Sequence, residues 1–419
     1  MKRISTKKTI AWLHLWVGLL SGLIILISML GAAIFVWQAE LTNWYYSDII
    51  YNRDAGKRIL PVSELHQNVS SAYPGKEFNF LLVENDPDRN YAWRSYKKAE
   101  EPGWTWPSGI EHYLTVFVNP YTGEVTGHID KRTDWITLSR FLHQTLLLEY
   151  ELGTKIIGFA GLIMIVLAIS GLVIWWPKTL RSLKQRLKIK WKAAFKRVNW
   201  DLHAVGGVYT YLFILFFATT GLVWSYSWWK NGIVRLLGDD PKEIFVFPEP
   251  PKIDESNYLD GMDIAYLDAL TKNREWTKIY FSVPKATMDK GRISTGIYYN
   301  RKDSWWNTND YYYYDPKTGE QYDTFTHDEK LLSEKWRHSN YDMHVGSIYG
   351  LPTKIIAFIC ALFFAFLPIS GFLIWWDKQK KKKIRKANGL KPRKPLNNTQ
   401  PKIKKRIEEK KKVLTLVED

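Results

Sequence analysis

The chain of 419 residues contains 59 Lys and Arg and 42 Asp and Glu residues, which gives a formal net charge of +17. Its apolar residues gather in four runs long enough for helices that cross the hydrocarbon core of a bilayer, which takes about 20 residues. This pattern excludes a wholly soluble protein. The single cysteine, Cys360, excludes a disulfide framework, a cysteine-ligated iron–sulfur cluster and covalently attached haem.

The positive charge is confined to one side of the predicted membrane. Segments 1–8, 177–200 and 378–419 hold 30 of the Lys and Arg residues and four of the acids, whereas the rest of the chain holds 29 and 38. Because Lys and Arg are enriched in cytoplasmic loops, both termini and the middle loop are predicted to be cytoplasmic. Basic runs beside a membrane also attract anionic lipid, so we interpret them as topology signals and not as a nucleic-acid-binding surface.

In chain order, the sequence predicts four membrane helices separated by two outer segments and one basic loop. The predicted parts are a cytoplasmic N-terminus (1–9), helix 10–37, a first outer domain (38–153), helix 154–176, a basic cytoplasmic loop (177–200), helix 201–229, a second outer domain (230–353), helix 354–376 and a basic cytoplasmic tail (377–419). The fold class is therefore membrane α plus α+β.

Both outer segments carry one helical pattern followed by four strand patterns. The predicted helices are 62–72 and 262–270, and the predicted strands are 78–83, 91–96, 112–118 and 124–129, then 276–283, 293–299, 311–314 and 321–325. A turn of the form Pro-x-Thr-Gly precedes the last strand of each set. We predict two small α+β domains on the outer side.

Several motifs occur twice, once in each half of the chain. ISGLVIWW (169–176) recurs as ISGFLIWW (369–376), and NPYTGE (119–124) recurs as DPKTGE (315–320). WLH (12–14) is echoed by WDLH (200–203). Two halves that enter the membrane from the same side indicate a parallel internal duplication, with a pseudo-twofold axis along the membrane normal.

These repeated motifs, together with FLHQTLLL (141–148), resemble the PepSY-associated transmembrane family of bacterial inner-membrane proteins. The resemblance covers nearly the whole chain except the basic tail. It implies that the outer segments are PepSY-like domains and that the protein lies in the inner membrane. The family includes iron-regulated membrane proteins and di-haem ferric-siderophore reductases, so the motifs are more specific for the family than for one activity.

Four of the nine histidines form two matched pairs. His14 and His203 lie about one turn inside the first and third membrane helices, at the cytoplasmic end, where a polar side chain is costly and usually functional. His143 and His344 each precede a membrane helix by about ten residues, which places them at the outer interface. We expect each pair to supply the axial ligands of one haem b, so that the chain carries two.

The alternatives are milder roles for the same residues. An interfacial histidine can be a polar group that reaches toward water, and the glycines near His14 and His203 can serve only to let helices approach closely. Arg140 and Arg337 precede the outer histidines and are candidates for contacts to haem propionates or for interfacial anchors. The remaining histidines are expected on the surface of the outer domains, solvated or hydrogen-bonded: His66, His112, His128, His327 and His338.

The function expected from these features is electron transfer across the membrane to an extracytoplasmic ferric chelate, most plainly a ferric siderophore, with release of Fe(II). The electron donor would be a quinol or a cytoplasmic reductase, because the chain has no nucleotide-binding motif. One alternative is a non-enzymatic regulator whose PepSY-like domains bind peptides or modulate a protease. Another is a haem conduit with a different acceptor, such as quinone or copper.

Overall fold

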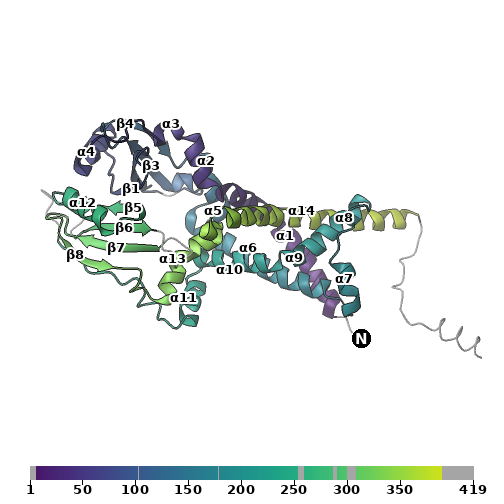
Figure 1. The fold of residues 1–419 in the computed structure, drawn as a ribbon. Coiled ribbons are helices and arrows are strands. Elements are labelled where there is room, and N and C mark those ends of the chain that lie inside the picture. Colours follow the sequence, from purple (N-terminus) through teal and green to yellow (C-terminus); the bar gives the residue numbers. More distant parts are fainter. Residues whose placement is uncertain are drawn as a thin grey trace, which may run out of the picture. The chain divides into compact units, whose positions relative to one another are not determined.

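The computed structural model describes residues 6–101, 103–177, 179–252, 259–285, 290–299 and 308–388 (Figure 1). The chain divides into two compact units, Met1–Phe372 and Leu373–Asp419. The second unit is described only for the end of helix α14 (Leu351–Ala387). Of the predicted basic tail, residues 389–419 lie outside the described residues.

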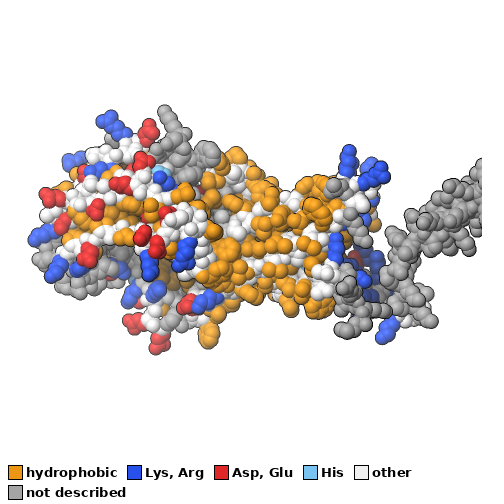
Figure 2. Space-filling model, turned by 90° about the horizontal axis from the view of Figure 1, so that it is seen from below, with side chains coloured by type: hydrophobic (Ala, Val, Ile, Leu, Met, Phe, Trp, Pro, Cys, Tyr) orange, Lys and Arg blue, Asp and Glu red, His pale blue; other side chains and the backbone are white. Residues whose placement is uncertain are grey.

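Three helices are long and apolar enough to cross a membrane: α1 (Thr6–Phe35), α6 (Tyr150–Trp175) and α14. A bent pair of helical segments, Phe195–Tyr209 and Tyr211–Ser225, makes a fourth span when the two are counted together. Figure 2 shows a broad hydrophobic surface over the helical part of the first unit, and charged side chains over the part that contains the sheet. Such a surface is suited to contact with lipid tails.

The third predicted membrane helix, 201–229, is not a single straight helix. It consists of α8 (Phe195–Asp201), a π-helical turn (Leu202–Gly206), α9 (Gly207–Tyr209) and α10 (Tyr211–Ser225), and it bends by 61°. At the bend, the hydroxyl of Thr210 donates a hydrogen bond to the carbonyl of Gly206 at 2.9 Å. Threonine bonds of this kind bend helices, and π-helical turns often occur at functional sites. Here the π-helical turn contains His203.

Several shorter helices were not predicted from the sequence. Two of them directly precede membrane helices, α5 (Trp135–Thr145) before α6 and α13 (Leu332–Val345) before α14. Asp134 caps α5 by accepting hydrogen bonds from the backbone of Ile136 and Thr137. The others are α2 (Gln38–Tyr45), α3 (Ser47–Ile50), α7 (Leu183–Arg186) and α11 (Ser227–Leu236).

The strands predicted in the two outer segments are present, and they join in one antiparallel sheet of order β4-β3-β2-β1-β5-β6-β7-β8. The first segment contributes β1 (Phe80–Glu84), β2 (Tyr91–Lys98), β3 (Ile110–Val118) and β4 (Val125–Asp130). The second contributes β5 (Trp276–Ser282), β6 (Ile293–Tyr299), β7 (Thr308–Tyr314) and β8 (Gln321–Phe325). The two predicted α+β domains therefore share a sheet, because β1 pairs with β5.

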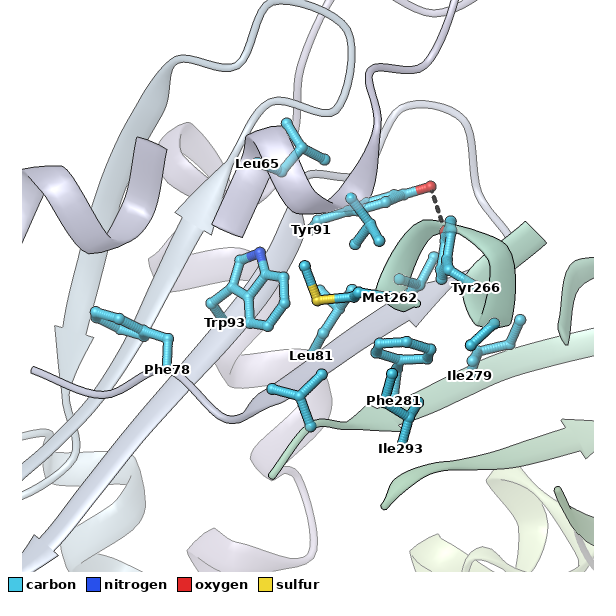
Figure 3. Close-up of a cluster of buried hydrophobic side chains, with 14 of the residues drawn as sticks. Leu65, Phe78, Leu81, Tyr91, Trp93, Met262, Tyr266, Ile279, Phe281 and Ile293 are labelled. Atoms are coloured by element: carbon cyan, nitrogen blue, oxygen red, sulfur yellow. Dashed lines mark hydrogen bonds between the residues drawn. The ribbon is translucent and has the colours of Figure 1, made fainter. Parts of the chain in front are cut away.

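The predicted helices α4 (Val62–Ala72) and α12 (Met262–Lys272) contribute to the main hydrophobic core together with one face of this sheet. Figure 3 shows that the core draws side chains from both outer segments, among them Trp93 from β2 and Phe281 from β5. The hydroxyl of Tyr266 donates to the hydroxyl of Tyr91 at 2.7 Å, inside the same core. Because each segment covers apolar surface of the other, their stabilities are coupled.

The repeated Pro-x-Thr-Gly turns have matching geometry in the two halves. The side chains of Asn119 and Asp315 each accept hydrogen bonds from the backbone two and three residues further on. Gly123 and Gly319 both adopt a φ of 74°, which L-amino acids with side chains rarely adopt. A Cβ at either glycine would also lie within 2.6 Å of a neighbouring atom, so both turns require glycine.

Candidate functional site: two histidine pairs

The structure brings the inner pair of histidines together. His14 lies on α1 and His203 in the π-helical turn, and their ring centroids are 6.5 Å apart with the ring planes at 88°. Two imidazoles on opposite sides of one metal, with bonds of about 2.0–2.1 Å, have centroids about 6.4 Å apart. The spacing of this pair therefore suits two axial ligands of one metal.

The outer pair has similar spacing. His143 lies on α5 and His344 on α13, with ring centroids 6.0 Å apart and planes at 30°. Burial lowers the pKa of both side chains, and for His344 the neighbouring His143 adds to the effect. Both rings are therefore neutral at physiological pH, which is the form that binds metals.

Each of the four histidines is held by a hydroxyl group at Nδ1. In the inner pair, Nδ1 of His14 lies 2.9 Å from Oγ of Ser170, and Nδ1 of His203 lies 2.7 Å from Oγ of Ser370. In the outer pair, Nδ1 of His143 lies 2.9 Å from Oγ of Ser28. Nδ1 of His344 lies 2.9 Å from Oγ1 of Thr220.

The hydroxyl hydrogens determine which way these bonds run. A hydroxyl has one hydrogen, and each of these four groups also reaches a backbone carbonyl: Ser28 that of His143, Ser170 that of Leu167, Thr220 that of Phe216, and Ser370 that of Leu367. The hydroxyl oxygen then accepts from the histidine, so the ring proton is on Nδ1. Nε2 is left as the lone-pair nitrogen, the arrangement typical of metal-binding histidines.

The repeated Ser-Gly motif has a structural role that the sequence alone did not reveal. After Ser170 and Ser370, each of which binds a histidine, come Gly171 and Gly371. A Cβ on Gly171 would lie 3.3 Å from Cε1 of His14, and a Cβ on Gly371 would lie at the same distance from Cε1 of His203. In both halves, serine orients the ring and glycine leaves room for it. The position of this dipeptide opposite a histidine was not visible before the helices were placed.

Of the glycines near His14 and His203 in the sequence, two lie where helices approach closely and none contacts a histidine ring. A Cβ at Gly206 would lie 2.4 Å from the ring of Phe363, and one at Gly22 would lie 3.2 Å from Pro368. Gly18 has only ordinary contact distances, and a Cβ at Gly207 would meet nothing within 4 Å. Gly22 and Gly206 therefore fit the milder role of close helix approach.

A cavity lies between the helices at the outer pair. It encloses about 1230 Å³, including space open to solvent, and its lining includes His143 and His344. Its walls are mostly apolar and contain several small residues: Ala32, Gly158, Ala160, Gly161, Ala218, Gly221, Ala357 and Ala361. Large apolar pockets with a few polar groups are typical of cofactor sites.

The ligand set fits haem better than a bare metal ion. Among the described residues, no group of three or more His, Cys, Asp or Glu side chains could hold a metal ion. Two neutral imidazoles supply two ligands, so the other four must come with the metal, as they do in a porphyrin. The apolar cavity around His143 and His344 has the character that such a flat, apolar group requires.

The two predicted arginines occupy different places. Arg140 is exposed and lines the cavity, with its guanidinium carbon 5.9 Å from the ring centroid of Phe35. Arg337 is not in the cavity lining; its guanidinium carbon lies 5.8 Å from the ring of Trp224, which does line the cavity. Arg140 is thus placed to meet a charged group in the cavity, whereas Arg337 only packs against Trp224.

The two pairs lie at different depths. Ser28, which binds His143, follows His14 by 14 residues on the same helix. At 1.5 Å per residue, the two positions are separated by about 21 Å along the helix axis. The pairs are therefore distinct sites, one toward the sheet and one toward the opposite end of the helices (Figure 1).

The other histidines form hydrogen bonds or pack within the outer segments. All five were expected on the surface, but two of them are buried. His112 and His327 are buried, since the strands and loops around them pack closely. His112 bonds Ser95 at 2.9 Å, and Nε2 of His66 bonds the carbonyl of Phe78 at 2.8 Å. Burial lowers the pKa of His338 to about 3, with the nearby Lys330 adding to the effect.

The helices long and apolar enough to cross a membrane, together with the antiparallel sheet, define a multi-pass membrane protein that brings two pairs of histidines together. The chain belongs to the PepSY-associated TM region family, whose model matches residues 11–378. The match confirms the resemblance found in the repeated motifs. A comparison with curated proteins found no match.

Proposed function

We propose that this chain is a di-haem electron-transfer protein of the bacterial inner membrane that reduces an extracytoplasmic ferric chelate, most plainly a ferric siderophore, and so releases Fe(II). The observation that carries the proposal is the pairing and the hydrogen bonding of the four histidines. In each pair, both rings have Nδ1 committed to a hydroxyl, at a spacing that suits one metal between two Nε2 atoms.

Haem held by two imidazoles supplies reversible one-electron chemistry without an open coordination position for oxygen. The two sites are about 21 Å apart along α1, and each site takes one histidine from each half of the chain. Ser28, Ser170, Thr220 and Ser370 fix the histidine tautomers. The lining of the outer cavity is mostly apolar, and Arg140 in that lining would offer a cation to a haem propionate.

The distribution of charge supports the membrane orientation that this outward electron path requires. The basic segments 1–8, 177–200 and 378–419 favour a cytoplasmic location for both termini. The inner pair then lies near the cytoplasmic face, where a quinol or a cytoplasmic reductase would donate, and the outer pair lies below the sheet. Reduction to Fe(II) weakens the hold of hard oxygen ligands on iron, which releases it from a chelate.

The matched geometry also favours an internal duplication. The contacts of Ser170 with His14 correspond to those of Ser370 with His203, and the turns at Asn119 and Asp315 have the same hydrogen bonds. We propose that the two halves are copies of one ancestral unit of helix, PepSY-like α+β segment and helix. Each unit then contributes one ligand to each haem.

The test is to purify the full chain in detergent and to record oxidised and dithionite-reduced spectra, with haem quantified as the pyridine haemochrome. Two b-type haems per chain are expected. His14→Ala and His143→Ala should each retain one, whereas His66→Ala, a histidine of the outer segment, should retain two. A protein that stays colourless after haem supplementation would overturn the proposal and favour the peptide-binding regulator.

The acceptor needs a separate measurement. The reduced protein should be reoxidised by ferric siderophores, as followed by the loss of the reduced α-band in stopped flow. Reoxidation by quinone or copper alone would keep the electron-transfer function and reject the ferric chelate.

A further inference from the structure

Two buried asparagines each stand four residues before a paired histidine. Asn199 on α8 precedes His203, and Asn340 on α13 precedes His344. Side chains four residues apart lie about one helical turn apart on the same face, so each asparagine and its histidine meet the same neighbouring helix. Asn199 and Asn340 are both buried, and buried amides need hydrogen-bond partners.

At the inner pair, the partner of the asparagine is the residue that orients the histidine. Nδ2 of Asn199 donates a hydrogen bond to the backbone carbonyl of Ser370 at 3.2 Å. Oγ of the same serine lies 2.7 Å from Nδ1 of His203. Ser370 on α14 is therefore bonded at two of its atoms by side chains from two successive turns.

The outer pair repeats this arrangement with different residues. Nδ2 of Asn340 donates to the backbone carbonyl of Thr220 at 3.1 Å, and Oγ1 of the same threonine lies 2.9 Å from Nδ1 of His344. Oδ1 of Asn340 is buried and has no hydrogen-bond partner within the described part of the chain. An unpaired buried oxygen costs free energy, so stability alone does not account for an asparagine at this position.

The first half of the chain has no amide at the corresponding positions. Ile10 stands four residues before His14, and Ser139 stands four residues before His143. Polar side chains between membrane helices often serve only to join the helices. Here, however, the offset from the histidine and the choice of acceptor are the same at both sites, which indicates a role at the histidines themselves.

We propose that Asn199 and Asn340 are positioning residues of the two histidine sites, which act through Ser370 and Thr220. The inference rests on the proposed function and adds one residue to each haem site. A carbonyl oxygen has two lone pairs, so it can accept the asparagine amide in addition to a bond within its own helix. Two contacts instead of one then fix the hydroxyl against Nδ1, and with it the plane and the tautomer of the ring.

The test replaces each asparagine by leucine, which has a similar volume but no hydrogen-bonding group. The full chain in detergent is studied by electron paramagnetic resonance and by spectroelectrochemical titration, and the haem retained in His14→Ala identifies the outer site. Asn340→Leu should change the signal and the reduction potential of the outer haem only, and Asn199→Leu those of the inner haem only. Equal changes in both haems, or changes in neither, would overturn the inference.

The matched control is Asn68→Leu, because Nδ2 of Asn68 also donates to a backbone carbonyl, that of Gly123 at 3.0 Å, but within the outer segment. Both haem signals should remain native in this variant. Haem content and the melting temperature report whether Asn340→Leu has folded, and Asn340→Ala is measured in the same way if it has not.

A double variant tests whether the asparagine acts through the threonine. Thr220→Val removes the hydroxyl group, so adding Asn340→Leu to Thr220→Val should shift the potential of the outer haem no further. Shifts that add in the double variant would show that Asn340 acts by another route and would reject the inference.

Failure of this inference differs from failure of the proposed function. Nitrogen-15 NMR of the histidine-labelled full chain reports which ring nitrogen carries the proton, in a haem-free protein or in the diamagnetic reduced protein, and His344→Ala identifies the resonance of His344. A colourless protein in which Asn340→Leu shifts His344 away from the Nδ1–H form would retain the positioning role and reject electron transfer. A haem protein whose potentials and ring protons do not respond to Asn199→Leu or Asn340→Leu would retain electron transfer and reject the positioning role.

Discussion

Ser170 and His14 are 156 positions apart in the chain, yet Oγ of Ser170 lies 2.9 Å from Nδ1 of His14. Ser370 and His203 repeat this contact at 2.7 Å in the second half. The tautomer of each histidine therefore depends on a helix from the same half, and the spacing of the two rings depends on the two halves meeting. If the pair binds haem as proposed, haem binding and assembly of the membrane helices are linked.

Replacing Ser170 by Ala should weaken the inner haem site. The variant removes the hydroxyl that accepts from Nδ1–H of the half-buried His14, and loss of such a hydrogen bond costs up to about 1–3 kcal/mol. We expect a lower haem content and a shifted reduction potential for one haem only, measured by spectroelectrochemical titration. Ser182→Ala, which changes a half-buried serine of the basic loop, should leave both potentials unchanged. Identical potentials in native protein and Ser170→Ala would show that the hydroxyl does not hold the ligand.

The glycines beside the histidines should not tolerate a methyl group. In Gly221→Ala, the new Cβ would lie 3.0 Å from Cε1 of His344 and would push the ring from its position. We expect loss of one haem, measured as the pyridine haemochrome. Gly207→Ala is the control, because a Cβ there meets nothing within 4 Å, and an added methyl in a helix is favourable by up to about 1 kcal/mol. Full haem content in Gly221→Ala would contradict the assigned site.

The sequence was sufficient to predict that His14 lies close to His203 and His143 close to His344, whereas their role as haem ligands stays a prediction. Membrane helices are visible in local hydrophobicity, and the position of His14 or His203 within a run places it along the membrane normal. The repeated motifs then show which residue of the first half corresponds to which residue of the second, so that His14 corresponds to His203. The predicted strands and the helices α4 and α12 are present for the same reason, since alternation and turn residues are local features.

What the sequence could not reveal depends on contacts between distant segments. The pairing of β1 with β5 joins residues about 200 positions apart, so one shared sheet was not distinguishable from two. Helices α5 and α13 were missed because short helices at an interface have no long apolar run. The capping residue Asp134 was the one local signal for α5. The hydroxyls of Ser28 and Thr220 have no motif, since any serine or threonine on a membrane helix can bond its own backbone.

The different ring angles of the two pairs predict two distinct magnetic signals. In low-spin ferric haem, nearly perpendicular axial imidazoles give a strongly anisotropic electron paramagnetic resonance signal, and nearly parallel ones give a rhombic signal. The planes of His14 and His203 are at 88°, and those of His143 and His344 are at 30°. The oxidised protein should therefore show both signals at low temperature. His14→Ala should remove the strongly anisotropic signal, and His143→Ala the rhombic one; the opposite assignment would contradict the structure.

The outer segments should lose stability in mild acid because of His338. Burial lowers the pKa of its imidazole to about 3, well below the ordinary value of 6.5. Between these values the unfolded chain binds a proton that the folded chain does not, so the free energy of unfolding falls as the pH decreases from 6.5 toward 3. The slope from this one group is at most about 1.4 kcal/mol per pH unit.

This contribution can be isolated by comparing variants. His338→Gln removes the titrating group, so the difference in melting temperature between pH 7 and pH 5 should be smaller in this variant than in the native chain. His128→Gln is the matched control: its imidazole bonds the hydroxyl of Tyr73 on an exposed part of the sheet, and the pH dependence should remain native. An unchanged pH dependence in His338→Gln would mean that the imidazole becomes protonated without unfolding, and that the hydrogen bond between the Tyr311 hydroxyl and Nε2 of His338 at 3.3 Å does not keep it neutral.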